Sequence, residues 1–201
     1  RIIDMGKIFC VMGKSASGKD TIYSRLLERN KIHVKKIIPY TTRPMRDGET
    51  DKETYFFCDE KKVQELEALG KIIELREYNT VYGIWKYFTV DDGQIDLANN
   101  NYILIGTLET FNKIVKYFGE DKVLPIYIEV EDGERLIRAI SREKQQNQPK
   151  YEEMCRRFLA DASDFSEENL HEAGVKRRFI NDDMDDTIEE IEKYINSNVT
   201  V

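Results

Sequence analysis

A glycine-bearing segment near the start of the sequence has the residue types of a phosphate-binding loop. Residues 13–20 read Gly-Lys-Ser-Ala-Ser-Gly-Lys-Asp and follow the short apolar run 7–12. A strand, such a loop and a helix N-terminus form a cradle of backbone N–H groups for phosphate, and Lys19 adds positive charge for the terminal phosphates. Asp20 stands where the P-loop pattern has a hydroxyl. We expect a nucleoside triphosphate to bind here, at Gly13, Ser15, Ala16, Ser17, Gly18, Lys19, Asp20 and Thr21.

A second segment, residues 41–49, carries two arginines that could hold an anion. It reads Thr-Thr-Arg-Pro-Met-Arg-Asp-Gly-Glu, and its proline and glycine keep it out of a helix. Arg43 and Arg46 can converge on one phosphate, because each guanidinium donates two parallel hydrogen bonds. Tyr55 and Tyr82 could donate hydroxyls to the same phosphate. The alternatives are solvated surface arginines and ordinary strand tyrosines.

Strand-like and helix-like segments alternate along most of the chain, which predicts a parallel sheet with helices on both faces. The expected strands are 7–12, 35–38, 102–106, 123–130 and 176–180, and the expected helices are 19–29, 107–118, 132–144, 151–170 and 184–196. Residues 40–90 break this alternation with strands near 55–58 and 72–75 around a helix at 59–69, which indicates an inserted α+β subdomain. The polar segment 143–152 is expected to be a mobile loop between two helices.

The composition indicates one domain with subdomains, or at most two small domains. The chain has 201 residues, of which 40% are hydrophobic and 34% charged, and a net charge of −7 argues against a non-specific nucleic-acid binder. No apolar run approaches the ~18 residues that span a membrane, and no secretory signal is present. Cys10, Cys58 and Cys155 lack metal or disulfide spacing, which indicates reduced thiols. We therefore expect a cytoplasmic protein without nucleic-acid or membrane partners, whose natural start is Met5.

Four blocks of the sequence, taken together and in order, resemble the guanylate kinase family from about residue 6 to residue 196. The blocks are Gly13 to Lys19; Thr41 to Glu49 with Tyr55 and Phe57; Ile73-Glu74 with Tyr82-Gly83; and Arg138 to Arg157 with Asn181-Asp182-Asp183. The resemblance implies a P-loop α/β fold with an inserted acceptor-binding subdomain and a helical lid. It implies a P-loop core at 5–38, 91–142 and 171–201, an acceptor subdomain at 39–90, and a lid with its following helix at 143–170.

The resemblance implies ATP-dependent phosphoryl transfer to a nucleoside monophosphate, with Mg²⁺ as cofactor and GMP or dGMP as the leading acceptor. It implies that Lys19, Arg43, Arg142 and Arg157 surround the transferred phosphate, and that Arg138 and Asn181 lie near the donor base. The implied acceptor site comprises Thr42, Arg43, Arg46, Tyr55, Glu74, Tyr82, Gly83 and Thr107.

Glu74 is the residue that would face the acceptor base. A carboxylate can accept hydrogen bonds from both the ring N–H and the exocyclic amine of guanine, which adenine does not offer. The alternative for Glu74 is a surface carboxylate on an edge strand. The alternative for Arg142 and Arg157 is an ordinary charged helix face.

The sequence departs from the family pattern at three places. Asp20 replaces the hydroxyl that binds Mg²⁺, and Ile105 and Thr107 stand where the family usually has two acids. We hypothesise that Asp20 takes over the positioning of Mg²⁺; the alternative is an acid that stabilises the helix N-terminus. Pro39, Ile84 and Trp85 replace small polar residues expected near guanine. Two alternatives to a nucleotide kinase therefore remain: a guanylate-kinase-like binding module without turnover, and a P-loop kinase for another phosphorylated small molecule.

Overall fold

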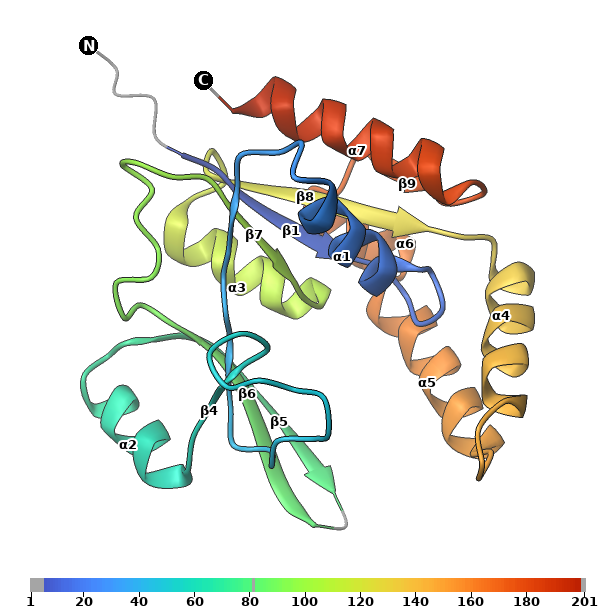
Figure 1. Ribbon diagram of the computed structural model, residues 1–201, viewed down its shortest axis with the longest axis horizontal. Helices are drawn as coiled ribbons and strands as arrows, with labels where there is room; N and C mark the ends of the chain where they lie inside the picture. The colour runs from blue at the N-terminus through green and yellow to red at the C-terminus, as the bar shows by residue number, and fades with distance from the viewer. Residues whose placement is uncertain (1–5, 81, 200–201) are drawn as a thin grey trace.

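A five-stranded parallel sheet forms the centre of the computed structural model, which describes residues 6–80 and 82–199 (Figure 1). The expected start at Met5 lies outside the described residues. The strand order is β2-β7-β1-β8-β9, and every neighbouring pair is parallel. The strands are β1 (Ile8–Met12), β2 (Lys35–Lys36), β7 (Tyr102–Ile105), β8 (Val123–Glu129) and β9 (Arg178–Ile180).

Helices cover both faces of this sheet because successive side chains of a strand point to opposite faces. On one face Ile8, Cys10 and Met12 pack with residues of α3 (Leu108–Phe118). On the other face Phe9 and Val11 pack with α1 (Lys19–Arg29) and α7 (Met184–Asn198). Burial on both faces explains why all five residues of β1 are apolar. The predicted α/β fold, a parallel sheet with helices on both faces, is confirmed.

A second sheet is built from residues 40–90. Its order is β4-β3-β6-β5, and β5 and β6 form a long antiparallel hairpin at one edge. One helix, α2 (Glu60–Ala68), covers it through a small core of Val63, Leu66, Phe88 and Val90. Figure 1 shows this unit on one side of the parallel sheet. The strands are β3 (Tyr40–Thr41), β4 (Phe56–Phe57), β5 (Ile72–Thr80) and β6 (Gly83–Val90).

Two helices lie side by side beyond the carboxyl end of β8: α4 (Asp132–Lys144) and α5 (Tyr151–Asp164) (Figure 1). The prediction of one helix over 151–170 was wrong, because the chain breaks at Phe165 and continues as α6 (Glu167–Glu172). Ser166 caps the new helix by accepting a hydrogen bond from the backbone N–H of Asn169. The break lets the Phe165 ring turn into the core against Tyr127.

The three cysteines differ in exposure. Cys10 is buried, Cys58 is partly buried and Cys155 is exposed, and all three thiols are free. Over residues 6–80 and 82–199, the helices are too short or too polar to cross a membrane. The cytoplasmic location stays a prediction.

Candidate functional site

The loop between β1 and α1 is built around two glycines that no other residue could replace without a clash. A Cβ on Gly13 would lie 2.6 Å from the Ser17 Oγ and 2.7 Å from the Ile128 carbonyl oxygen. A Cβ on Gly18 would lie 2.6 Å from the Asn181 Nδ2, and Gly18 has a φ of +85°. The chain can therefore close tightly against β8 and Asn181, and it delivers Lys19 to the first position of α1. This is the geometry of a helix N-terminus that binds phosphate.

Lys19 and Asp20 lie next to each other at the end of this loop. The Lys19 Nζ is 2.9 Å from the Asp20 Oδ2, and the Asp20 side chain is 80% exposed. The described residues include no group of three or more His, Cys, Asp or Glu side chains that could hold a metal ion by themselves. Mg²⁺ is usually held by one or two carboxylates together with substrate phosphates and water. The exposed Asp20 carboxylate fits that arrangement, in which bound nucleotide supplies the other ligands.

Beside the loop, Arg138 and Asn181, the two residues expected near a donor base, line one cavity of about 340 Å³ with Ala16 and Gly18. Arg142, which was expected beside the transferred phosphate, lines this cavity too and not the cavity that contains Lys19 and Arg157. Asn181 is buried, and its Nδ2 donates to the Ser17 carbonyl at 2.8 Å. The structure therefore joins the loop to α4 and to the segment after β9 in one pocket. Thr21 is exposed on α1.

The helices α4 and α5 contact the loop through Ser15. The Arg157 Nη2 donates to the Ser15 Oγ at 3.3 Å, and the Arg135 Nη1 donates to the Ser15 carbonyl at 2.9 Å. The Ser15 backbone N–H donates to the Asp161 Oδ2 at 2.7 Å. The Asp161 carboxylate of α5 therefore accepts a hydrogen bond from one of the backbone N–H groups that are predicted to bind phosphate.

Arg135 and Asp161 were missed from the sequence. Arg135 is 1% exposed, is held by the Asp132 carboxylate at 3.0 Å, and stacks over the Phe158 ring at 4.3 Å. The i,i+3 spacing of Asp132 and Arg135 was a visible sign of this ion pair.

A cavity of about 600 Å³ extends from the loop to the second sheet. It is lined by Gly13 of the loop and Lys19 at the start of α1, by Arg157 of α5, by Tyr55 just before β4, and by Arg76 of β5. Thr107 also lines it, at the N-terminus of α3, where the Thr107 hydroxyl accepts a hydrogen bond from the Thr110 N–H at 3.1 Å. One cavity thus connects the phosphate loop, α5 and the unit built from residues 40–90.

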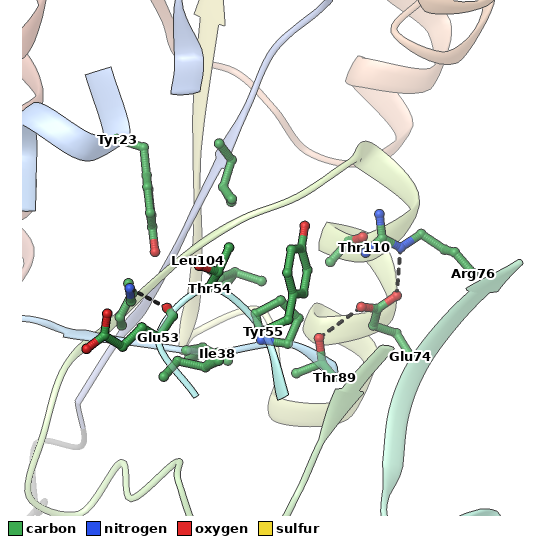
Figure 2. A pocket seen from close by; sticks show the side chains of 14 residues that line it. Tyr23, Ile38, Glu53, Thr54, Tyr55, Glu74, Arg76, Thr89, Leu104 and Thr110 are labelled. Carbon is green, nitrogen blue, oxygen red and sulfur yellow. Dashed lines mark hydrogen bonds and ion pairs between the residues drawn. The ribbon is translucent and has the colours of Figure 1, made fainter. Parts of the chain in front are cut away.

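A neighbouring cavity of about 310 Å³ contains Glu74 (Figure 2). Glu74 is only 2% exposed although β5 is an edge strand, so it is not a surface carboxylate. Its Oε1 accepts a hydrogen bond from the Thr89 hydroxyl at 2.9 Å, and its Oε2 accepts one from the Arg76 Nε at 3.1 Å. The cavity walls include Pro39 and Ile105, which lie where polar residues were expected. A buried, paired carboxylate therefore lies where the acceptor base is predicted to bind.

The predicted anion clamp is only partly assembled. Arg43 is 4% exposed and donates to both oxygens of Glu49, at 2.6 and 2.9 Å. These hydrogen bonds from Arg43 hold the pKa of Glu49 at about 2, well below its usual value. The Arg43 Nε also donates to the Tyr87 hydroxyl at 3.1 Å, and its guanidinium lies 5.4 Å from the Tyr55 ring. Arg43 and Tyr55 are therefore close together, but the guanidinium is bound to a carboxylate.

The other predicted clamp residues either point into solvent or form hydrogen bonds that involve the backbone. The Arg46 side chain is exposed, and its backbone N–H donates to Glu49 at 2.7 Å. Tyr82 is 81% exposed and stacks on Trp85, with the two rings within 7° of parallel. The Thr42 hydroxyl accepts from the Lys86 backbone N–H, which links β6 to the loop after β3, and Gly83 begins β6 with a φ of +108°.

Comparisons with known proteins point to one family. The family model described as guanylate kinase matches residues 5–198. This chain is 28% identical to a guanylate kinase of Wolbachia sp. subsp. Brugia malayi and 27% identical to a guanylate kinase of Mycoplasmoides gallisepticum. Each match covers 94% of this chain and 92% of the relative.

Other similarities are partial or limited to the fold. A match of 36% identity to a guanylate kinase of Aliivibrio fischeri spans 44% of this chain and 45% of that protein, so this chain spans about half the length of that relative. The crystal structure of a guanylate kinase from Anaplasma phagocytophilum matches 96% of this chain with a TM-score of 0.63 and 22% identity, covering 86% of that chain. This structural match supports the fold described above.

Proposed function

The chain belongs to the guanylate kinase family, and from that premise we propose that it transfers the γ-phosphoryl group of ATP to a nucleoside monophosphate, with GMP or dGMP as the leading acceptor. The observation that carries the proposal is the cavity of about 600 Å³ that joins Lys19 in the phosphate loop to Tyr55 and Arg76 in the inserted sheet. A donor on the loop and an acceptor on the sheet would meet in this space.

Phosphoryl transfer requires in-line positioning and cations that spread charge over the moving group. Lys19, at the N-terminus of α1, would contact the donor phosphates, and Arg157 already contacts the loop at Ser15. Arg142, on α4, would approach with the lid. No general base is needed, because a phosphate monoester is largely ionised at neutral pH. Closure of α4 and α5 over the loop would exclude water and limit ATP hydrolysis.

Arg43 would hold the acceptor phosphate after exchanging its partner. Its fork is bidentate on Glu49 in the structure, and a phosphate dianion offers the same pair of acceptor oxygens. Tyr55 lies against the Arg43 guanidinium and lines the cavity, so it would donate to the same phosphate. Arg46 and Tyr82 are exposed and would reach this phosphate only after the hairpin and the 41–49 loop close.

The proposal is tested by following ADP release with GMP, dGMP, AMP, CMP, UMP and phosphorylated metabolites as acceptors. Turnover with GMP or dGMP is expected. Turnover with only a non-nucleotide acceptor would favour a different P-loop kinase. No turnover with any acceptor would favour a guanylate-kinase-like binding module.

Asp20 is predicted to hold Mg²⁺ together with the bound triphosphate, where the ion would supply positive charge to the donor oxygens. Replacing Asp20 by asparagine is expected to lower Mg²⁺-dependent turnover by about 10²-fold. ATP binding without Mg²⁺ should be equal or tighter, because a carboxylate repels the triphosphate. Calorimetry with and without Mg²⁺ measures the second effect independently of activity.

The control for this prediction is Glu28→Gln, which neutralises an exposed carboxylate on the same helix two turns away. It should leave both turnover and Mg²⁺-assisted ATP binding unchanged. Full turnover in Asp20→Asn, with ATP binding still strengthened by Mg²⁺, would assign Asp20 to the helix N-terminus alone.

Asp161 is predicted to compete with ATP for the phosphate loop. Its carboxylate accepts the Ser15 N–H at 2.7 Å, a donor that a triphosphate would need. Replacing Asp161 by asparagine should weaken this contact and tighten ATP binding about fivefold, which corresponds to about 1 kcal/mol. Calorimetric titration of ATP checks the change, with the exposed Glu152→Gln on the same helix as control. Unchanged or weaker binding would show that α5 does not compete with the nucleotide.

A further inference from the structure

We propose that Arg76 is a specificity-determining residue that reads the acceptor base, by donating hydrogen bonds to the O6 and N7 atoms of a 6-oxopurine. The proposal deepens the proposed function and rests on it, because it assumes that the acceptor base enters the cavity that contains Glu74. Arg76 belongs to none of the motifs that the sequence analysis singled out.

Arg76 lies where an acceptor base must pass. It lines both the cavity of about 310 Å³ around Glu74 and the cavity of about 600 Å³ that reaches the phosphate loop. Its side chain is 16% exposed, whereas the Glu74 side chain has no exposed surface. Figure 2 shows the Arg76 guanidinium beside the Glu74 carboxylate, on the same side of the cavity as Thr110. A base that enters would therefore meet the guanidinium together with the carboxylate.

The Arg76 guanidinium is held in one orientation by the Glu74 carboxylate, and that carboxylate is held in turn by Thr89. Its Nε donates to the Glu74 Oε2 at 3.1 Å, and the other oxygen of that carboxylate accepts from Thr89 at 2.9 Å. Antiparallel pairing sets this arrangement, since Glu74 lies opposite Thr89 and Arg76 lies opposite Tyr87 in the β5–β6 register. The contact with Glu74 uses the Nε–H, and the Tyr78 side chain is a second hydrogen-bonding neighbour of the guanidinium. The two Nη atoms carry four N–H groups, so donors remain for a bound base beside Tyr78.

The two side chains together match the hydrogen-bonding groups of guanine. Guanine presents N7 and O6 as acceptors, and an arginine fork binds both at once. Its ring N–H and exocyclic amine are donors, which suit the lone pairs of Glu74 that Thr89 and Arg76 leave free. Adenine places an amino donor where guanine has O6, so an arginine donor there would lose its partner. Pro39 and Ile105, on the adjoining walls, offer no side-chain donor that could replace Arg76.

The test compares GMP with 7-deaza-GMP, which lacks the N7 acceptor, in the full-length protein and in Arg76→Met. The wild type is expected to lose about tenfold in kcat/KM on 7-deaza-GMP. Arg76→Met should lose about tenfold on GMP and show less than about a twofold difference between the two nucleotides. Arg76→Lys keeps the charge without the fork and should also lose the discrimination. Inosine monophosphate lacks only the exocyclic amine of GMP. Its kcat/KM relative to that of GMP should therefore be the same in wild type and Arg76→Lys.

Two outcomes would overturn the proposal. One is an equal kcat/KM of the wild type for GMP and 7-deaza-GMP, and the other is the same loss of kcat/KM on 7-deaza-GMP in wild type, Arg76→Met and Arg76→Lys. The control Arg177→Met removes an arginine that pairs with Glu190 at 2.9 Å on another part of the surface, and it should keep the wild-type penalty. If the wild type turns over no nucleotide, the proposed function fails, and dissociation constants for GMP and 7-deaza-GMP then decide the role of Arg76. Absence of GMP binding would overturn both.

Discussion

Replacing Lys19 by methionine is expected to lower kcat/KM for phosphoryl transfer by about 10³-fold while leaving the fold intact. Lys19 is the first residue of α1, and its side chain lines the cavity that joins the phosphate loop to the inserted sheet. Methionine has a similar length and shape, so the substitution removes the charge and little of the packing. The charge is most valuable when the γ-phosphoryl group is in transit, because that is when negative charge spreads over its oxygens. The loss should therefore appear mainly in kcat.

The other lysine of the same loop provides a matched control. The Lys14 Nζ lies 3.3 Å from the Asp132 carboxylate and lines a different cavity, so Lys14→Met should keep most of the activity. Coupled ADP release gives the rates, calorimetry the ATP affinity, and circular dichroism the fold. Activity within tenfold of wild type in Lys19→Met would mean that this loop does not hold the donor phosphates.

The parts of the site that the sequence predicts are those whose geometry is local. The phosphate loop follows from Gly13 and Gly18 and from the strand and helix on either side, and each glycine proves to lie against a neighbour that excludes a Cβ. The central strands β1 and β7 follow from apolar runs, since a strand buried on both faces has no polar positions. The edge strand β2 has no such signal, because it consists of the exposed Lys35 and Lys36. The split after α5 was missed because Ser166 was not recognised as the cap of a new helix.

The parts that could not be predicted depend on contacts between distant segments. Arg135 meets Ser15 across 120 positions, and Asp161 meets the same residue across 146, so no local pattern reveals them. Arg76 was missed for a related reason. Its surroundings are fixed by the β5–β6 hairpin, and β6 was not predicted, so the pairing of Glu74 with Thr89 was not available. The Arg43–Glu49 ion pair could have been predicted from the sequence, because both residues lie in one short loop.

Replacing Glu74 by glutamine is expected to remove most of the preference for guanine. A neutral amide has one acceptor oxygen where the carboxylate has two, so it cannot receive both the ring N–H and the exocyclic amine. We expect kcat/KM for GMP to fall by about 10²-fold or more, because a site built to hydrogen-bond a group rejects a mismatched partner strongly. ATP binding on the phosphate loop should be unchanged. The control is Glu77→Gln, which neutralises a half-exposed acid on the same strand that pairs with Lys86 at 3.3 Å.

The ratio of GMP to inosine monophosphate turnover separates base recognition from a structural role for Glu74. Inosine monophosphate lacks the exocyclic amine, so the wild type should prefer GMP, and Glu74→Gln should bring the two rates close together. Loss of the carboxylate also leaves the Arg76 guanidinium, which is 16% exposed, without its counter-charge, and some loss of thermal stability is expected. A purely structural role would lower the rates with both nucleotides by the same factor. An unchanged ratio in a folded Glu74→Gln protein would therefore show that the acceptor base does not contact Glu74.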